Sequence, residues 1–202
     1  MSDHPIRLVV ADDLRRSRLT VFFRLLLAIP HLVWLYLWSF AVQIAAVVGW
    51  FAALVLGRLP QPLHRFSAAY VSYAAQVHAY LSLVANPFPG FVGAQYPLRI
   101  EIDPPERQNR LLTFFRLLLA LPAFVIATLL GYLLFAIGFL GWFAALVTGR
   151  MPPGFRDLSA AAIRYTAQTY AYTLLLTAQY PNSSPALPSP VELEPAGAEA
   201  PA

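Results

Sequence analysis

The chain has 202 residues, of which 58% are hydrophobic and only 12% charged, about half the charged fraction of a typical soluble domain. This composition indicates contact with lipid. The formal net charge is +4 and the sequence contains no cysteine, which excludes disulfides, thiolate catalysis and cysteine-ligated metal sites. All 14 basic residues are arginine, whose planar side chain suits bidentate pairing with phosphate.

The sequence repeats itself without a gap. Residues 4–89 align with residues 96–181 at roughly 40% identity, which is far above chance and indicates duplication of one structural unit. We therefore divide the chain into membrane repeat 1 (1–90), membrane repeat 2 (91–181) and a Pro/Ala/Glu-rich tail (182–202) that we expect to be disordered.

Each repeat opens with a short segment in which apolar and polar residues alternate. These segments are IRLVV at 6–10 and LRIEI at 98–102. Such alternation is typical of a half-exposed strand, and the two strands could pair into a small β-sheet. An arginine-rich turn follows each of them.

A long apolar run comes next, at residues 25–57 and 117–149, with no charged residue in either copy. A straight helix of that length would reach about 50 Å, whereas a hydrocarbon core is about 30 Å thick and two full spans would need about 40 residues. Length alone therefore does not decide between one crossing and two.

Flanking charge and aromatic position favour two crossings. Arginine stands at both ends of each run, as the positive-inside rule expects when both ends face the cytoplasm. Trp34, Tyr36 and Trp38 fall in the middle of the first run, where a single span would place them at the bilayer centre although Trp and Tyr prefer the interfaces. We therefore predict a hairpin of two short antiparallel helices in each repeat, at 22–38 and 41–57, then 114–130 and 133–149.

The hairpins need a bend and a close helix contact. Ser39 and Gln43 in the first copy, and Gly131 in the second, suit the bend. Small residues would let the two helices approach closely; they are Gly49, Ala52, Ala53, Gly138, Gly141, Ala144 and Ala145.

A helical segment of 20 residues closes each repeat, at 66–85 and 158–177. Arg164 and many Tyr, Ser, Thr and Gln residues favour a helix that lies in the headgroup region. The competing topology has one long tilted helix per apolar run and a second crossing by this segment, which is long enough to span. The predicted fold is thus a mostly α integral membrane protein, each repeat consisting of a strand, a transmembrane hairpin and an amphipathic interfacial helix.

Arg24 and Arg116 lie one turn inside the apolar helices, in the shared stretch FFRLLLA. An arginine so placed can snorkel to lipid phosphate, pair with a carboxylate or hold an anionic ligand. Pro30 and Pro122 follow six residues later and would kink the helix or mark its true start.

The motif GWFAALVLGRLP at 49–60 returns as GWFAALVTGRMP at 141–152. Its glycine is expected to end the helix in a left-handed cap, its arginine to favour the negative end of the helix dipole and nearby phosphate, and its proline to stop further helix. The residues are Gly57, Arg58 and Pro60 in the first copy, and Gly149, Arg150 and Pro152 in the second. Arg24, Arg58, Arg116 and Arg150 are the candidate lipid or anion contacts.

No catalytic, cofactor or metal site is predicted. The four histidines lack helical metal-ligand spacing, and we expect them at the surface or the membrane interface. The acidic residues lie outside the apolar runs and form no acid/base pair. A nucleic-acid role is disfavoured because the arginines cluster at the boundaries of the runs instead of forming a basic face with stacking aromatics.

Taken together, FFRLLLAIP, GWFAALVLGRLP and the closing AYLSLV resemble a family of uncharacterised bacterial membrane proteins, domain of unknown function 4389, across both repeats. The resemblance implies a small multi-pass protein with the unit in tandem, and no reaction or cofactor.

We expect a non-enzymatic, multi-pass protein of the bacterial cytoplasmic (inner) membrane with cytoplasmic termini. Its expected role is that of an accessory or scaffold protein that organises lipid or a membrane-protein partner, with homo-oligomerisation as a further option. The alternative is a small oligomeric channel or lipid/solute transporter, for which the runs offer few polar residues: Ser39, Gln43, Thr128 and Thr148.

Overall fold

The computed structural model describes residues 6–10, 17–90 and 96–182. In chain order the elements are β1 (Ile6–Val10), α1 (Arg18–Leu56), α2 (Gln61–Leu81), β2 (Leu98–Ile102), α3 (Arg110–Phe114), α4 (Arg116–Thr148) and α5 (Pro153–Thr173). The chain is mostly helical, and each repeat contributes one long apolar helix, α1 or α4. Apart from Asn182, the predicted tail lies outside the described residues.

The predicted hairpins are wrong, because each apolar run forms one continuous helix. α1 runs for 39 residues and α4 for 33. Ser39 and Gln43, which suggested a bend, both lie inside α1, and the Ser39 hydroxyl donates to Tyr36 O at 2.6 Å. Gly131, the bend predicted for the second copy, lies inside α4. Since Leu and Ala are strong helix formers, one glycine or serine does not interrupt the helix.

Trp38, one of the aromatic residues in the middle of α1, has another explanation. Trp38 stacks against Tyr70 and Tyr73 of α2, with ring centroids 5.7 and 5.8 Å away. Its position in the run therefore reflects packing against a neighbouring helix. Pro30 and Pro122 both lie inside the long helices, so neither marks a helix start.

A sharp turn joins each long helix to the helix that follows. Gly57 and Gly149 adopt the left-handed conformation expected of a helix cap, with φ of 71° and 72°. Pro60 and Pro152 stand at the N-caps of α2 and α5. These two helices begin at 61 and 153, five residues earlier than predicted, because proline fits the first turn of a helix. α2 then packs back along α1, and α5 along α4.

β1 and β2 pair antiparallel as a two-stranded ribbon, and no wider sheet forms within the described ranges. Leu8 pairs with Ile100, which is its equivalent in the other repeat, 92 positions later. A pseudo-twofold axis relating the two repeats therefore passes through this pair. In β2, Leu98 is buried while Arg99 and Glu101 are exposed, so this strand has one apolar face and one charged face, as the alternation predicted; we call the side with Arg99 and Glu101 the charged face of the ribbon.

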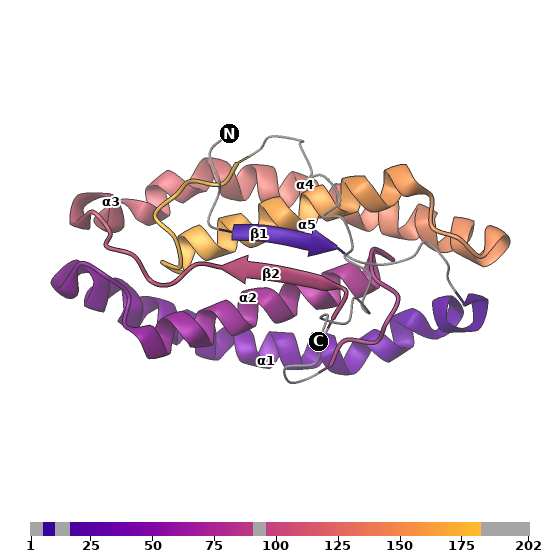
Figure 1. The fold of residues 1–202 in the computed structure, drawn as a ribbon, viewed down its shortest axis with the longest axis horizontal. Helices are drawn as coiled ribbons and strands as arrows, with labels where there is room; N and C mark the ends of the chain where they lie inside the picture. The colour runs from indigo at the N-terminus through magenta and orange to yellow at the C-terminus, as the bar shows by residue number, and fades with distance from the viewer. Residues whose placement is uncertain (1–5, 11–16, 91–95, 183–202) are drawn as a thin grey trace, which may run out of the picture.

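The elements form three layers, with strands and helices all running close to the long axis of the molecule (Figure 1). The ribbon packs on α2 and α5, which also pack on each other. α1 and α4 lie on the far side of this helix pair (Figure 1). They run antiparallel, since Arg18 at the start of α1 contacts the end of α4, and Arg110 in α3, directly before α4, contacts the end of α1.

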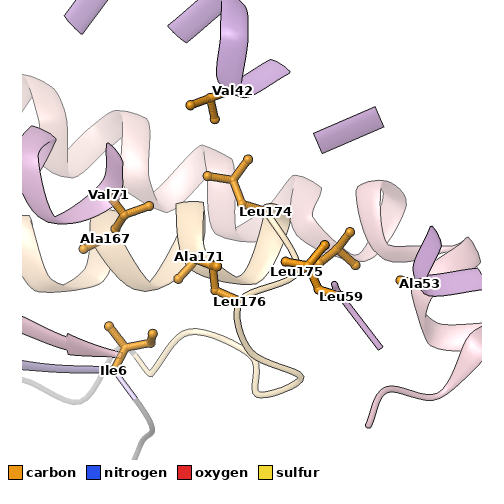
Figure 2. Close-up of a cluster of buried hydrophobic side chains, with 10 residues drawn as sticks. All are labelled: Ile6, Val42, Ala53, Leu59, Val71, Ala167, Ala171, Leu174, Leu175 and Leu176. Carbon is orange, nitrogen blue, oxygen red and sulfur yellow. The ribbon is translucent and has the colours of Figure 1, made fainter. Parts of the chain in front are cut away.

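A buried apolar cluster ties the layers together (Figure 2). It draws on the ribbon, on α1, on α2 and on the end of α5, so neither repeat forms this part of the core alone. Its members are Ile6, Val42, Ala53, Leu59, Val71, Ala167, Ala171, Leu174, Leu175 and Leu176.

Candidate functional site

The repeated tryptophan connects the two repeats. The indole N–H of Trp50 donates to Thr113 O of α3 at 2.9 Å, and that of Trp142 donates to Val21 O of α1 at 2.8 Å. Each motif therefore contacts the other repeat at the start of α1 or in α3, the short helix directly before α4. Backbone carbonyls in the first turns of a helix normally accept within it, so the indole adds a second, directional bond that fixes the helix pair in register.

The first glycine of the motif gives room for close packing. A Cβ at Gly49 would stand 2.7 Å from the Leu59 side chain, and one at Gly141 would stand 2.9 Å from the Met151 side chain. Leu59 and Met151, the variable residues of the Gly-Arg-x-Pro turn, are both buried. The motif thus folds its own turn back onto its own glycine.

One buried leucine lies beside the first glycine of each motif, and the sequence predicted neither of them. Leu83 and Leu175 have φ of 58° and 65°, a conformation that L-residues other than glycine rarely adopt. Both are buried, and each lies next to the motif glycine of the opposite repeat: Leu83 near Gly141, and Leu175 near Gly49. Burial of the leucine offsets the backbone strain. The only sequence signal for these leucines is that both occupy the same position in the repeat.

Arg24 and Arg116 point inward and hold the ends of α2 and α5. Only 1% and 2% of their surfaces are exposed. Arg24 Nη1 donates to Tyr80 O at 2.6 Å and to Ala85 O at 3.3 Å, and Nη2 donates to Asn86 Oδ1 at 3.1 Å. The last carbonyls of a helix have no partner within it, so these bonds act as a C-terminal cap.

The second repeat has the same arrangement. Arg116 Nη1 donates to Tyr172 O at 2.8 Å and to Thr177 O at 3.0 Å. Each guanidinium also lies over a tyrosine ring, Arg24 over Tyr80 at 4.4 Å and Arg116 over Tyr172 at 4.6 Å from the ring centroid. We call Arg24 and Arg116 the arginine clips. Their lipid or anion role stays a prediction, whereas their contacts with the protein are structural.

Four other arginines, Arg18, Arg58, Arg110 and Arg150, lie near the ends of the long helices. Arg58 and Arg150, the remaining predicted contacts, are exposed directly after the long helices. Arg18 donates to Val147 O and Arg110 to Val55 O, both at 2.9 Å, so each satisfies a carbonyl in the last turns of the opposite long helix. This role of the flanking arginines was not predicted.

A groove opens between α1 and α4 near the pseudo-twofold axis. Two adjoining cavities of about 510 and 680 Å3 make it up, and they share Leu32, His78, Gly131 and Leu134. α1 and α4 form its walls, and α2 and α5 its roof. Among the described residues none of its lining comes from the ribbon, so it opens on the opposite side of the molecule.

The histidine prediction needs a correction. His31 and His64 are buried, not at the surface. Nδ1 of His31 hydrogen-bonds the hydroxyl of Tyr73, and burial raises the pKa of Tyr73 to about 12, so this hydroxyl keeps its proton near neutral pH. His78 is exposed and borders the groove. Within the described ranges no three His, Cys, Asp or Glu side chains are placed to hold a metal ion.

The exposed faces of the long helices are apolar. Ile44, Val55 and Phe135 are 68%, 71% and 78% exposed, and many other large apolar residues of α1 and α4 are exposed with them. Both helices are long and apolar enough to cross a membrane.

Comparison with known proteins identifies the repeated unit. Residues 18–92 and 110–184 each match the family described as Domain of unknown function (DUF4389). No curated protein and no solved structure matches the chain.

Proposed function

The chain belongs to this family, whose unit it carries twice in tandem, and on that premise we propose that it is a non-enzymatic membrane protein that organises lipid, binding acyl chains in the groove between α1 and α4. The bacterial cytoplasmic membrane is its proposed location, with the charged ribbon side and the termini toward the cytoplasm. A membrane-protein partner or a second copy would occupy the remaining exposed faces.

The groove is the observation that carries this proposal. Its two cavities fall in the range of about 300–1,000 Å3 that is usual for small-molecule sites. Lipid tails are as apolar as leucine, so no hydrophobic force drives a tail into the groove. An empty groove would nevertheless leave its lining without van der Waals partners, and a tail of matching shape supplies them.

A few polar side chains at the groove give it the means to select among lipids. Ser39, Thr128 and Thr166 line one cavity, and His78 lines both. Precisely placed polar groups in an apolar pocket fix the orientation of a ligand. The Ser39 and Thr128 hydroxyls donate within their own helices, so the Thr166 hydroxyl is the donor that we propose for the glycerol-ester or headgroup oxygens of a lipid.

The channel alternative has less support. A channel needs polar groups that face a path, but the Ser39 hydroxyl donates to Tyr36 O and the Thr128 hydroxyl to Phe124 O, each within its own helix. The Thr148 hydroxyl likewise donates to Ala144 O. Each of these three hydroxyls donates to a backbone carbonyl of its own helix, which leaves little to replace water around a solute.

Gly131 offers a direct test, because a Cβ there would meet nothing within 4 Å and the residue lines both cavities. Gly131→Leu should fill the groove without disturbing the fold, since leucine favours a helix over glycine by almost 1 kcal/mol. Gly154→Leu is the matched control, because Gly154 also has open space around its Cα but lies outside the groove.

The measurement is native mass spectrometry of protein purified in mild detergent, with quantification of retained phospholipid. We expect the wild type and Gly154→Leu to retain equal amounts of lipid, and Gly131→Leu to retain several-fold less. Equal retention by all three proteins would rule out the groove as the lipid site.

A further inference from the structure

The long helices do not match the thickness of a bilayer. α1 has 39 residues and therefore spans about 58 Å, nearly twice the hydrocarbon thickness of about 30 Å. A helix crossing at its full length would have to tilt by about 60°, beyond the usual range of 0–40° for transmembrane helices. Length alone thus disfavours a crossing.

The ribbon gives a stronger reason. It lies over the middle of the long helices and runs in their direction (Figure 1). If α1 and α4 crossed the membrane, Arg99 and Glu101 on the exposed face of β2 would stand near the bilayer centre. Charged side chains there are costly, and the free edges of a two-stranded ribbon would leave backbone groups without partners in hydrocarbon.

The arginines lead to the same conclusion independently. Arg18 and Arg150 lie at one end of the helix pair, and Arg58 and Arg110 at the other, because the two helices are antiparallel. A crossing pair would place basic residues equally on both sides of the membrane, against the positive-inside rule. Both ends can face one side only if the helices do not cross.

We propose that this chain is monotopic: α1 and α4 lie parallel to the membrane plane within one leaflet, with the pseudo-twofold axis along the membrane normal. The apolar faces of the two long helices are the lipid-binding surface, and their occupant is the acyl layer of that leaflet. α2 and α5 lie at headgroup level, and the charged face of the ribbon meets water. The arginines at both ends reach phosphate in the same leaflet.

This arrangement departs from both multi-pass topologies expected from the sequence, the one with hairpins and the one in which a long tilted helix and the closing helical segment of each repeat both cross the membrane. It also makes the two repeats equivalent with respect to the membrane, because rotation about the normal exchanges them. A crossing pair would instead present the repeats in opposite orientations.

Single cysteines test the orientation, since the chain has none of its own. Gln61→Cys and Gly154→Cys place thiols beyond the C-terminal ends of α1 and α4, at opposite ends of the molecule, and Glu101→Cys places one on the ribbon; all three positions are exposed. A membrane-impermeant maleimide is applied to intact spheroplasts and to inside-out vesicles. Ile44→Cys, on the apolar face of α1, is the protected control.

For a monotopic chain the three thiols should react from the same side, and Ile44→Cys should react only after detergent is added. If Gln61→Cys and Gly154→Cys react from opposite sides, or Glu101→Cys is protected on both sides, the helices cross and the proposal fails. This readout does not involve bound lipid, so it stands or falls separately from the groove.

The depth of α1 in the bilayer provides a second test, which does not depend on the side of the membrane from which a label is added. A fluorophore on Leu26→Cys, Ile44→Cys or Val55→Cys samples three exposed positions along α1. Quenching by lipids brominated at different carbon positions should report similar depths for a helix parallel to the membrane. A middle position much deeper than both ends would overturn the proposal.

Discussion

Replacing an arginine clip should show whether it stabilises the fold. Arg116→Met keeps an unbranched side chain and removes the charge. It loses two charge-assisted hydrogen bonds, at 2.8 and 3.0 Å, which contribute about 1.5–3 kcal/mol each, and a cation–π contact worth about 0.5–2 kcal/mol. Against this, burying a guanidinium costs several kcal/mol, which the methionine recovers.

The net change in stability depends on the two carbonyls that lose Arg116 as a hydrogen-bond donor. Tyr172 O still accepts a bond from the Leu175 backbone N–H at 3.2 Å, whereas Thr177 O loses the donor that Arg116 supplied. An unsatisfied buried acceptor costs about 1–3 kcal/mol. With the lost cation–π contact, we expect Arg116→Met to lower the free energy of unfolding by about 2–3 kcal/mol. For a chain of this size that corresponds to a fall in Tm of about 4–12 °C.

Thermal unfolding followed by far-UV circular dichroism in one detergent measures this change. Arg150→Met is the control, because Arg150 is exposed and its replacement should alter stability by no more than about 0.5 kcal/mol. A Tm of Arg116→Met equal to that of the wild type would refute the reasoning. It would mean that desolvation of the guanidinium cancels its contacts and that the clip contributes no net stability.

Three further predictions concern the repeated motif and the buried His64. Trp50→Phe and Trp142→Phe each remove one indole hydrogen bond and should lower the free energy of unfolding by about 0.5–1.5 kcal/mol. Because the two sites are far apart, the double variant should lose the sum of the two effects. A clear departure from additivity in thermal unfolding would contradict this. Gly49→Ala should lower the free energy of unfolding by about 1–3 kcal/mol, since its Cβ would stand 2.7 Å from the Leu59 side chain. Adding Leu59→Val should restore part of the lost Tm. If Tm is not restored, the contact is unimportant. Burial lowers the pKa of His64 below 6.5, so the unfolded chain binds a proton more readily; stability should fall as the pH drops below about 6.5, and His64→Gln should flatten that part of the pH profile of Tm.

The sequence was sufficient to predict the two repeats and both strands, because these depend on local patterns. The gapless repeat predicted two equivalent halves, and alternation at 6–10 and 98–102 located both strands. Glycine at 57 and 149 marked the helix ends because a left-handed residue there is a local requirement of the chain.

The hairpin prediction was wrong because it relied on residues whose packing partners lie elsewhere in the chain. Trp38 suggested an interface but packs on α2. Gly138 and Gly141 suggested a close pair of helices within one hairpin, but they face Ser82 and Met151 on other segments. Small and aromatic residues show that something packs closely at a position, and only the fold shows what it is.

The sequence singled out the two arginine clips, but it did not predict what they contact. Their place in FFRLLLA favoured snorkelling to lipid phosphate over a carboxylate or an anionic ligand. Their contacts with backbone carbonyls could not be predicted, since burial depends on where the end of α2 or α5 lies in the fold. The groove had no sequence signal at all, because its walls come from two helices that are far apart in the chain.

The reciprocal tryptophan bonds bear on how such a chain could have arisen. A gene encoding one unit would give a polypeptide whose indole N–H has no helix start of a second unit to bind. Two identical copies around a twofold axis would restore both bonds, as in an isologous homodimer. Fusion of two such genes would remove the need for subunits to meet by diffusion and would free each half to diverge. His31, which hydrogen-bonds Tyr73 where the other half has Ala123, is one residue at which the two halves already differ.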